Sequence, residues 1–296
     1  MRSALLLGTF FYVSSMLLFA ETAIETADRL YDEELHKEGY AYLVSALKDP
    51  HNEIQPAELY WRLSRVTKEI GDIAERKGAE SSELVSIFEE AESYASRAID
   101  LDAESYWGYY WKSANIARLA ASKGFMKSIF LIKPMKEAAE TALRINPRHS
   151  NSYYLLSIMY KSAPGRPIAF GSVDFAVSLC RKAIDLNRID NENGKADLDL
   201  WYHLELARHL GKRDWDEKKR IKKQPEKARE FAQAEGELEA SFYYEGTVDI
   251  GDRSDMAEAI EILVWLTEEY ENKKLPKETE RLAYKEAQAL LSELLK

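Results

Sequence analysis

Three short segments of the chain share one pattern at similar intervals, and this recurrence favours folds that are built from repeats. The segments read AIDLD, ALRIN and AIDLN and begin at Ala98, Ala142 and Ala183. The three alanines are therefore 44 and 41 residues apart. A unit of this length that cannot bury its apolar face alone is stabilised by stacking on its neighbours. We expect an array in which each unit packs on the next.

Small residues before each segment indicate that the units are pairs of α-helices. Residues spaced by three and four share one helix face, and small ones there allow a second helix to approach closely. The small residues are Ala91, Ala95 and Ala98 in the first unit, Ala139 and Ala142 in the second, and Ala176, Cys180 and Ala183 in the third. In each unit, another helix precedes these small residues and carries an aromatic residue, leucine or a small residue at matching positions. An example is the set Tyr153, Leu156, Ser157 and Tyr160.

This pattern resembles the tetratricopeptide (TPR) repeat, which implies an all-α fold: a TPR-like α-solenoid of antiparallel helix pairs. The standard unit has about 34 residues, so we assign the extra length here to enlarged turns within each repeat. Further helix pairs are expected at 22–37 with 39–48, at 197–211 with 225–240, and at 254–271 with 276–295. We therefore predict a single domain over residues 21–296, with an array of about 22–271 and a C-terminal helix at 276–295.

The first twenty residues, MRSALLLGTFFYVSSMLLFA, have the layout of a secretory signal peptide. Arg2 is their only charge, an apolar run follows from Ala4 to Phe19, and the small Ala20 precedes an acidic stretch. Cleavage there would place the mature protein in the periplasm or an equivalent exported location, with no stable membrane insertion. The alternative is an uncleaved N-terminal membrane anchor, for which the run is slightly short.

Composition argues against several classes of function. The formal net charge of −10 disfavours nucleic-acid binding, which depends on the neutralisation of phosphates. One cysteine, Cys180, cannot form an internal disulfide, and we interpret it and the five histidines as packing or surface residues. No spacing typical of a metal site, a nucleotide-binding loop or a catalytic triad occurs. We therefore predict no catalytic residues, no metal and no cofactor.

The concave groove of a TPR-like array is the expected partner-binding site. With Ser64, Ala114, Ser157 and Ala207 as the small packing residues, the positions three before and one after each should face this groove. Aromatic side chains there would supply buried area, and arginines would pair with a carboxylate. The alternative is that the tryptophans belong to the core between repeats. Arg118 lies one turn beyond Asn115 and is added to the set. The predicted groove residues are Trp61, Arg65, Trp111, Asn115, Arg118, Tyr154 and Arg208.

Two other segments stand out. The stretch PGRPIAFGS at 164–172 forms either a rigid turn that packs on a neighbouring repeat or an anion site, for which we name Arg166, Gly171 and Ser172. The run at 212–223 holds seven Lys or Arg residues together with acidic ones. It is either an ordinary solvated connector or a basic patch for an acidic lipid or partner.

The segments ELYWRLSRVTKEIGD, SYWGYYWKSANIARL and PGRPIAFGSVDFA carry a narrower resemblance over roughly residues 25–270. They are similar to the TPR proteins associated with TRAP transporters, the T component of uptake systems that depend on a substrate-binding protein. They also resemble the regulators of microtubule dynamics. The first resemblance implies an exported accessory whose partner is a periplasmic substrate-binding protein. The chain lacks the lipidation cysteine of the transporter-associated lipoproteins.

We therefore expect an exported, non-catalytic TPR protein that binds a partner protein or peptide in its groove. A transport accessory is the narrower version of this prediction. The alternative is a structural scaffold in a cell-envelope assembly with no ligand of its own, and a homo-oligomer stays open in either case.

Overall fold

The computed structural model describes residues 22–49, 51, 53–124 and 129–296. Over these ranges the chain is almost wholly α-helical and contains no β-strand, which confirms the predicted all-α solenoid. The expected signal peptide at 1–20 lies outside the described residues. None of the helices in the described part combines the length and apolarity that a bilayer-spanning segment requires.

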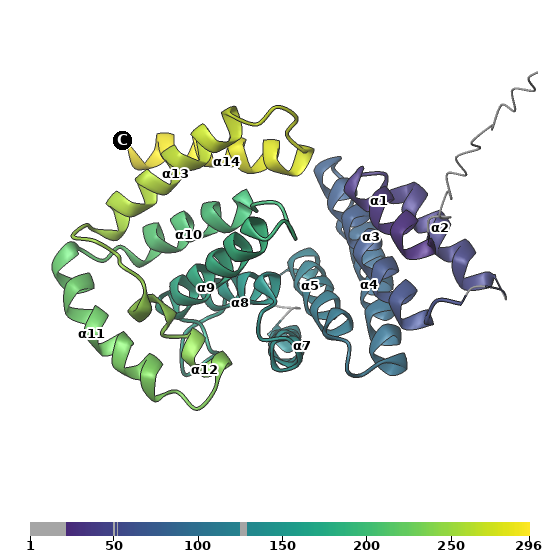
Figure 1. Cartoon of the computed structure of the whole chain (residues 1–296), viewed down its shortest axis with the longest axis horizontal. Helices are drawn as coiled ribbons and strands as arrows, with labels where there is room; N and C mark the ends of the chain where they lie inside the picture. Colours follow the sequence, from purple (N-terminus) through teal and green to yellow (C-terminus); the bar gives the residue numbers. More distant parts are fainter. Residues whose placement is uncertain (1–21, 50, 52, 125–128) are drawn as a thin grey trace, which may run out of the picture.

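Helix pairs follow one another along the chain (Figure 1). The first pair packs on the second, and in each of the later pairs the two helices pack along one another. The four pairs are α1 (Ala23–Asp32) with α2 (His36–Lys48), α3 (Pro56–Arg76) with α4 (Ser81–Leu101), α5 (Tyr106–Lys123) with α7 (Ile132–Ile145), and α8 (Ser150–Ser162) with α9 (Val173–Glu192). A short 3-10 helix, η1 (Ile129–Leu131), leads into α7.

The C-terminal half departs from the predicted order. Helix α10 (Leu200–Arg213) packs on α13 (Asp255–Glu271) and not on the next helix in sequence. The insertion between them contains α11 (Glu217–Gln233), α12 (Glu237–Ser241) and η2 (Tyr244–Thr247). The expected pair of 197–211 with 225–240 is therefore wrong, because α11 packs on η2 instead. The last helix, α14 (Glu278–Leu294), packs on α13 and α10.

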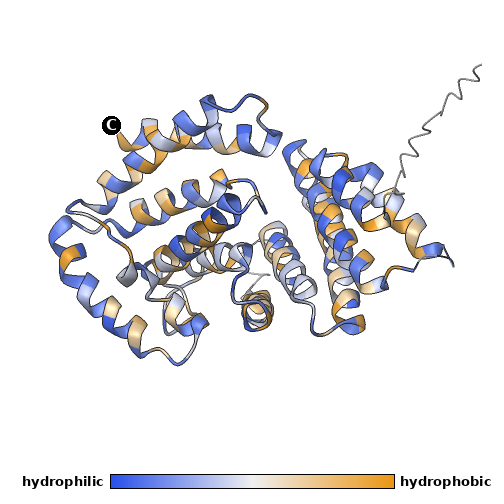
Figure 2. Ribbon diagram, in the orientation of Figure 1, coloured by the Kyte–Doolittle hydropathy of each residue, from blue (hydrophilic) through white to orange (hydrophobic). Residues whose placement is uncertain are grey.

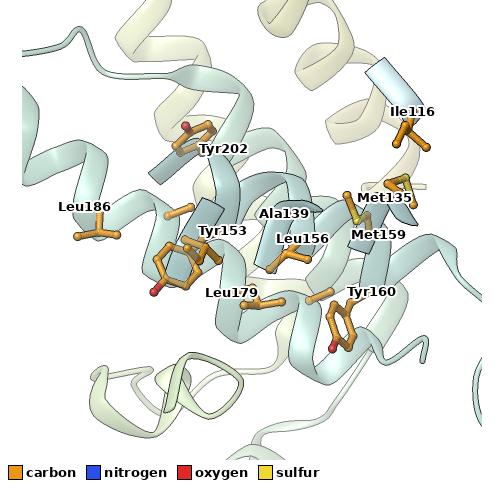
Figure 3. Close-up of a cluster of buried hydrophobic side chains, with 13 residues drawn as sticks. Ile116, Met135, Ala139, Tyr153, Leu156, Met159, Tyr160, Leu179, Leu186 and Tyr202 are labelled. Carbon is orange, nitrogen blue, oxygen red and sulfur yellow. The ribbon is translucent and has the colours of Figure 1, made fainter. Parts of the chain in front are cut away.

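The repeat anchors lie in the core, as their spacing predicted. Ala98, Ala142 and Ala183 are all buried. Figure 3 shows the central cluster, in which side chains of α7, α8 and α9 interdigitate around Leu156 and Leu179. Cys180 is buried and its thiol donates to the carbonyl oxygen of Tyr202 at 3.3 Å, so it is a packing residue. These contacts confirm the small-residue faces as helix-packing surfaces.

The extra length of the repeats is distributed unevenly. Helices α3 and α4 have 21 residues each and are joined by a short turn, so the first long repeat is long in its helices. The enlarged turn is found between α8 and α9, at residues 163–172. There a Cβ atom on Gly171 would lie 2.0 Å from the carbonyl oxygen of Ala163, so only glycine fits this position.

Candidate functional site: the inner groove

A groove of about 1140 Å³ runs along the inner face of the array. One wall is formed by α3, α5 and α8, and the opposite side by the α9–α10 loop and the start of α14 (Figure 1). The first turn of α14 lies near the N-terminal helices (Figure 1). The hydrogen bond with Arg281 holds the pKa of Glu278 below its usual value, and the charge of Arg76 on α3 makes a smaller contribution in the same direction. The groove therefore lies between segments that are far apart in the sequence.

Aromatic side chains form the middle of the groove. Trp107, Tyr110 and Trp111 come from the first turns of α5, and Tyr154 comes from α8. Tyr154 stacks on Tyr202 of α10 with ring centroids 4.5 Å apart and an interplanar angle of 20°. Because these rings are packed against one another, they form a rigid apolar surface.

Ion pairs form the wall on α3. Lys68 binds Asp72 at 2.6 Å and Glu69 at 3.1 Å, and Arg118 on α5 binds the same Asp72 at 2.6 Å and also contacts Glu75. Burial alone would raise the pKa of Asp72, but Lys68 and Arg118 outweigh it and hold that pKa below its usual value. The charges of this wall are thus largely satisfied within the protein.

Four of the predicted groove residues line the groove: Arg65, Trp111, Arg118 and Tyr154. The Arg65 guanidinium lies over the ring of Tyr31 at 3.9 Å and donates to Asp28 at 2.5 Å. Arg118 is held by Asp72 and Glu75. The arginines lie at the predicted place, but intramolecular carboxylates already occupy them. The expected preference for a carboxylate ligand therefore loses its geometric support.

The other three predicted groove residues do not line the groove. Asn115 is fully buried between α5 and α3, where its Nδ2 donates to Ser64 Oγ at 2.8 Å and to the Trp111 carbonyl at 2.9 Å. Trp61 is 3% exposed and stacks on Trp107 with centroids 4.8 Å apart. Arg208 bridges Glu205 and Glu286 and ties α10 to α14. Asn115 and Trp61 therefore belong to the core between repeats.

The turn at 163–172 is built as a rigid turn. The Gly171 N–H donates to the Pro164 carbonyl and the Ser172 N–H donates to the Tyr160 carbonyl, each at 2.8 Å. The Ser172 hydroxyl caps α9 by accepting from the Phe175 N–H. Arg166 is exposed. The backbone donors that an anion would need are thus engaged within the chain, which supports the turn over the anion site.

The basic run at 212–223 is divided between solvent and the interior. Lys212, Lys218, Lys219 and Lys222 are exposed, as a solvated connector predicts, but two arginines of the run are buried. Residues from 217 onward are helical, and Arg213 and Arg220 are buried, although α11 is otherwise strongly hydrophilic (Figure 2). Arg213 binds Asp255 at 2.7 Å and Glu245 at 2.6 Å. Burial alone would raise the pKa of Glu245, but the surrounding cations hold that pKa well below its usual value.

These residues belong to a buried ion network with four basic and four acidic members. It joins α9, α10, α11, η2 and α13. The members are Arg181, Arg213, Arg220 and Lys227 with Asp174, Glu245, Asp255 and Glu258. Their charges balance, and buried charges that are paired in this way fix the positions of the elements that carry them.

No grouping of His, Cys, Asp and Glu suited to a metal ion occurs within the part of the chain that the structure describes. The buried histidines His149 and His209 have a pKa lowered to about 3 by burial. Each is hydrogen-bonded to a serine, Ser152 and Ser157 respectively. Neutral, packed imidazoles of this kind are structural groups.

Comparison with known proteins places the chain among repeat proteins. The sequence model described as "Regulator of microtubule dynamics protein 1-3" matches residues 23–159. Regulator of microtubule dynamics protein 1 from Bos taurus is 29% identical over 138 residues, which cover 47% of this chain and 41% of that protein; the Mus musculus protein is 28% identical, with coverage of 47% and 43%. The chain thus spans about two fifths of the length of these relatives.

Among solved structures, a thermophilic TPR protein from Thermus thermophilus aligns with a TM-score of 0.55 at 13% identity, over 90% of this chain and 97% of that one. The chain is a TPR-like repeat protein related to the regulator-of-microtubule-dynamics group. Scaffolds of this class are generally non-catalytic and serve protein–protein interaction. In this TPR-like protein, the family match spans α1 to α8 and so contains the aromatic middle and the α3 wall of the groove.

Several residues that line the groove of the TPR-like protein were not predicted from the sequence. Lys68 and Asp72 follow Arg65 at helical steps on the same face of α3, so the periodicity could have identified them. Trp107 lies one turn before Trp111 on α5, so helical periodicity could have identified it as well. Asp199 carried no local signal, because only the tertiary fold brings the α9–α10 loop to the groove.

Proposed function

We propose that this protein is a non-catalytic interaction protein that holds a segment of a partner protein in its inner groove. The observation that carries the proposal is the groove itself, with its rigid aromatic middle formed by α5 and α8. Its volume of about 1140 Å³ exceeds that of most small-molecule pockets, which hold roughly 300–1,000 Å³, and suits an extended peptide segment. The TPR-like fold supports the same class of function.

A steric block tests this proposal. Ala121 is an exposed residue of α5 that lines the groove, so Ala121→Trp places a bulky ring in the groove without disturbing the core. Ala232 is an exposed residue of α11 outside the groove, and Ala232→Trp is the matched control. Partners captured by the wild-type protein and identified by mass spectrometry should be lost with Ala121→Trp and kept with Ala232→Trp. Equal capture by both variants would move the binding site away from the groove.

We further propose that the protein is exported, on the basis of the Arg2 start and apolar run of residues 1–20. N-terminal sequencing of the native protein should then begin close to Glu21. An intact Met1 in the cytoplasmic fraction would refute export, and an intact Met1 in the membrane fraction would favour the anchor.

The accessory role in a TRAP-type transporter rests on the sequence resemblance alone, and we retain it as a narrower proposal. The scaffold in an envelope assembly is its alternative. The same capture experiment distinguishes them: a periplasmic substrate-binding protein that is lost with Ala121→Trp supports the accessory role. Envelope components that are retained with both variants support the scaffold.

A further inference from the structure

One acidic side chain of the groove is held in place without a counter-ion. Asp199 is the N-cap of α10, where its carboxylate accepts from the Trp201 N–H at 2.9 Å. Its own N–H donates to Asn187 Oδ1 at 2.8 Å, so both the backbone and the side chain are fixed. Asp199 lines the groove beside Leu198 and Leu200.

The other carboxylates that line the groove have basic partners. Glu69 and Asp72 bind Lys68, Glu75 binds Arg118, and the remaining three are likewise paired: Asp197 with Lys277, Glu280 with Lys273, and Glu286 with Arg208. Among the described residues, no basic side chain forms an ion pair with Asp199. The charge of Lys273 lowers the pKa of Asp199 from a distance, but the ammonium group of Lys273 is bound to Glu280.

An unpaired carboxylate at this place works against the stability of the fold. Burial raises the pKa of Asp199 to about 6, and the negative charge of Glu280 contributes in the same direction. Asparagine and serine cap helices about as well as aspartate, without the cost of a partly buried charge. Features that lower stability without a local structural need are typical of functional sites.

Two tyrosines line the same groove as this carboxylate, Tyr110 and Tyr154. The charge of Asp199 contributes, after burial, to a raised pKa of Tyr110, Tyr154 and Tyr202, so all three lie within its electrostatic reach. Tyr202 stacks under Tyr154. A groove that offers both tyrosine rings and a carboxylate has the chemistry that binds an ammonium or guanidinium group, through cation–π and charge-assisted contacts.

We propose that Asp199, together with the rings of Tyr110 and Tyr154, forms a subsite that binds a lysine or arginine side chain of the partner segment. This inference rests on the proposed function, because it names the chemistry of the segment that the groove holds. The groove is much larger than a single amine requires, so the occupant is a basic peptide and not a free amine. The net charge of −10 favours approach of a basic partner.

Two peptide pools test the subsite even while the natural partner is unidentified. Both contain N-acetylated, C-amidated nonapeptides of random sequence; the central residue is lysine in one pool and norleucine in the other. Norleucine keeps an aliphatic stem but lacks the charge. The immobilised protein should retain the lysine pool about tenfold more than the norleucine pool, as expected for one hydrogen-bonded charge. Free N-acetyl-lysine amide should not compete at concentrations at which the peptides bind.

Three variants separate the subsite from its alternatives. Asp199→Asn keeps the helix cap and should abolish the preference for lysine. Asp216→Asn removes the same charge from an exposed N-cap aspartate, that of α11, outside the groove, and should preserve it. Ala121→Trp should abolish retention of both pools. The subsite would be refuted, and groove binding left intact, if the preference for the lysine pool survived Asp199→Asn or if both aspartate variants abolished it. The groove itself would be refuted if Ala121→Trp left the retention of both pools unchanged.

Discussion

Arg118 on α5 donates from Nε to Asp72 on α3 at 2.6 Å, so an ion pair joins the two helices that carry the charged wall of the groove. Asp72 also receives the Lys68 ammonium, at 2.6 Å. The pair is partly buried, which distinguishes it from ion pairs on the outer surface. It explains why an arginine at a predicted ligand-binding position is unavailable to a ligand.

We expect Arg118→Ala to lower the free energy of unfolding by about 1.5–3 kcal/mol, because it removes hydrogen bonds to a partly buried carboxylate. Urea denaturation of the purified protein measures the effect. The control is Arg97→Ala, which removes an exposed contact to Asp100 at 4.0 Å and should cost less than about 1 kcal/mol.

The same ion pair predicts an effect of acid. Since the folded-state pKa of Asp72 is below 3.8, its contribution to stability is present above that pH and is lost as the pH falls further. The stability difference between wild type and Arg118→Ala should therefore shrink in acid. A difference that stays constant down to about pH 2, below the usual range of a carboxylate pKa, would contradict the assignment.

Asp199→Asn should stabilise the protein at neutral pH. The folded-state pKa of about 6 exceeds the usual 3.8, so ionisation of Asp199 opposes folding above pH 6, and this penalty disappears below about pH 4. The other charged or titratable neighbours are Glu280, Lys273, His203 and the three tyrosines named above. Burial lowers the pKa of His203 to about 4, so it is neutral at pH 7.5, and its protonation near pH 4 occurs in both proteins. The melting temperature of the variant should exceed that of wild type at about pH 7.5 and equal it near pH 4.

Gly171→Ala should destabilise the turn between α8 and α9. The added methyl group would lie 2.0 Å from the Ala163 carbonyl oxygen, and backbone cannot yield as a flexible side chain can. We expect a loss of about 1–3 kcal/mol or more in thermal or urea unfolding. In Gly165→Ala the new Cβ would meet only the Gly171 oxygen, at 3.7 Å, so that variant should be close to wild type.

Arg213→Ala should be among the most damaging single substitutions. It leaves Glu245 and Asp255 buried without a main partner, which in other proteins costs about 3–5 kcal/mol. Arg281→Ala, which breaks an exposed pair with Glu278, should cost less than about 1 kcal/mol. Comparable losses in the two variants would mean that the network contributes little.

Local periodicity predicted the fold well. The anchors at Ala98, Ala142 and Ala183 predicted helix-packing faces because a small residue on a helix has one dominant structural use, close approach. Periodicity could not predict that α13, and not α11, packs beside α10. This packing involves an apolar cluster shared by α10 and α13 and the pairing of Arg213 with acidic residues more than thirty positions away, and the sequence has no periodic signal for either.

The groove was predicted only in part, for a related reason. The repeat register identified the correct helices and placed Arg65, Arg118 and Tyr154 on the correct face. It could not reveal that the arginines are occupied, because Asp28 and Asp72 pair with them from other turns or helices. The prediction that Asn115 faces the groove was wrong, because a polar residue at this position can equally bind a buried serine of the adjacent helix.

The buried ion network has a consequence for how this array unfolds. Solenoids with only nearest-neighbour contacts can open repeat by repeat from either end. Here residues between 174 and 258 on five elements share one set of charges, and separating any element would expose several of them at once. The C-terminal half is therefore expected to open as one cooperative block in hydrogen exchange, while α1 and α2 fray independently.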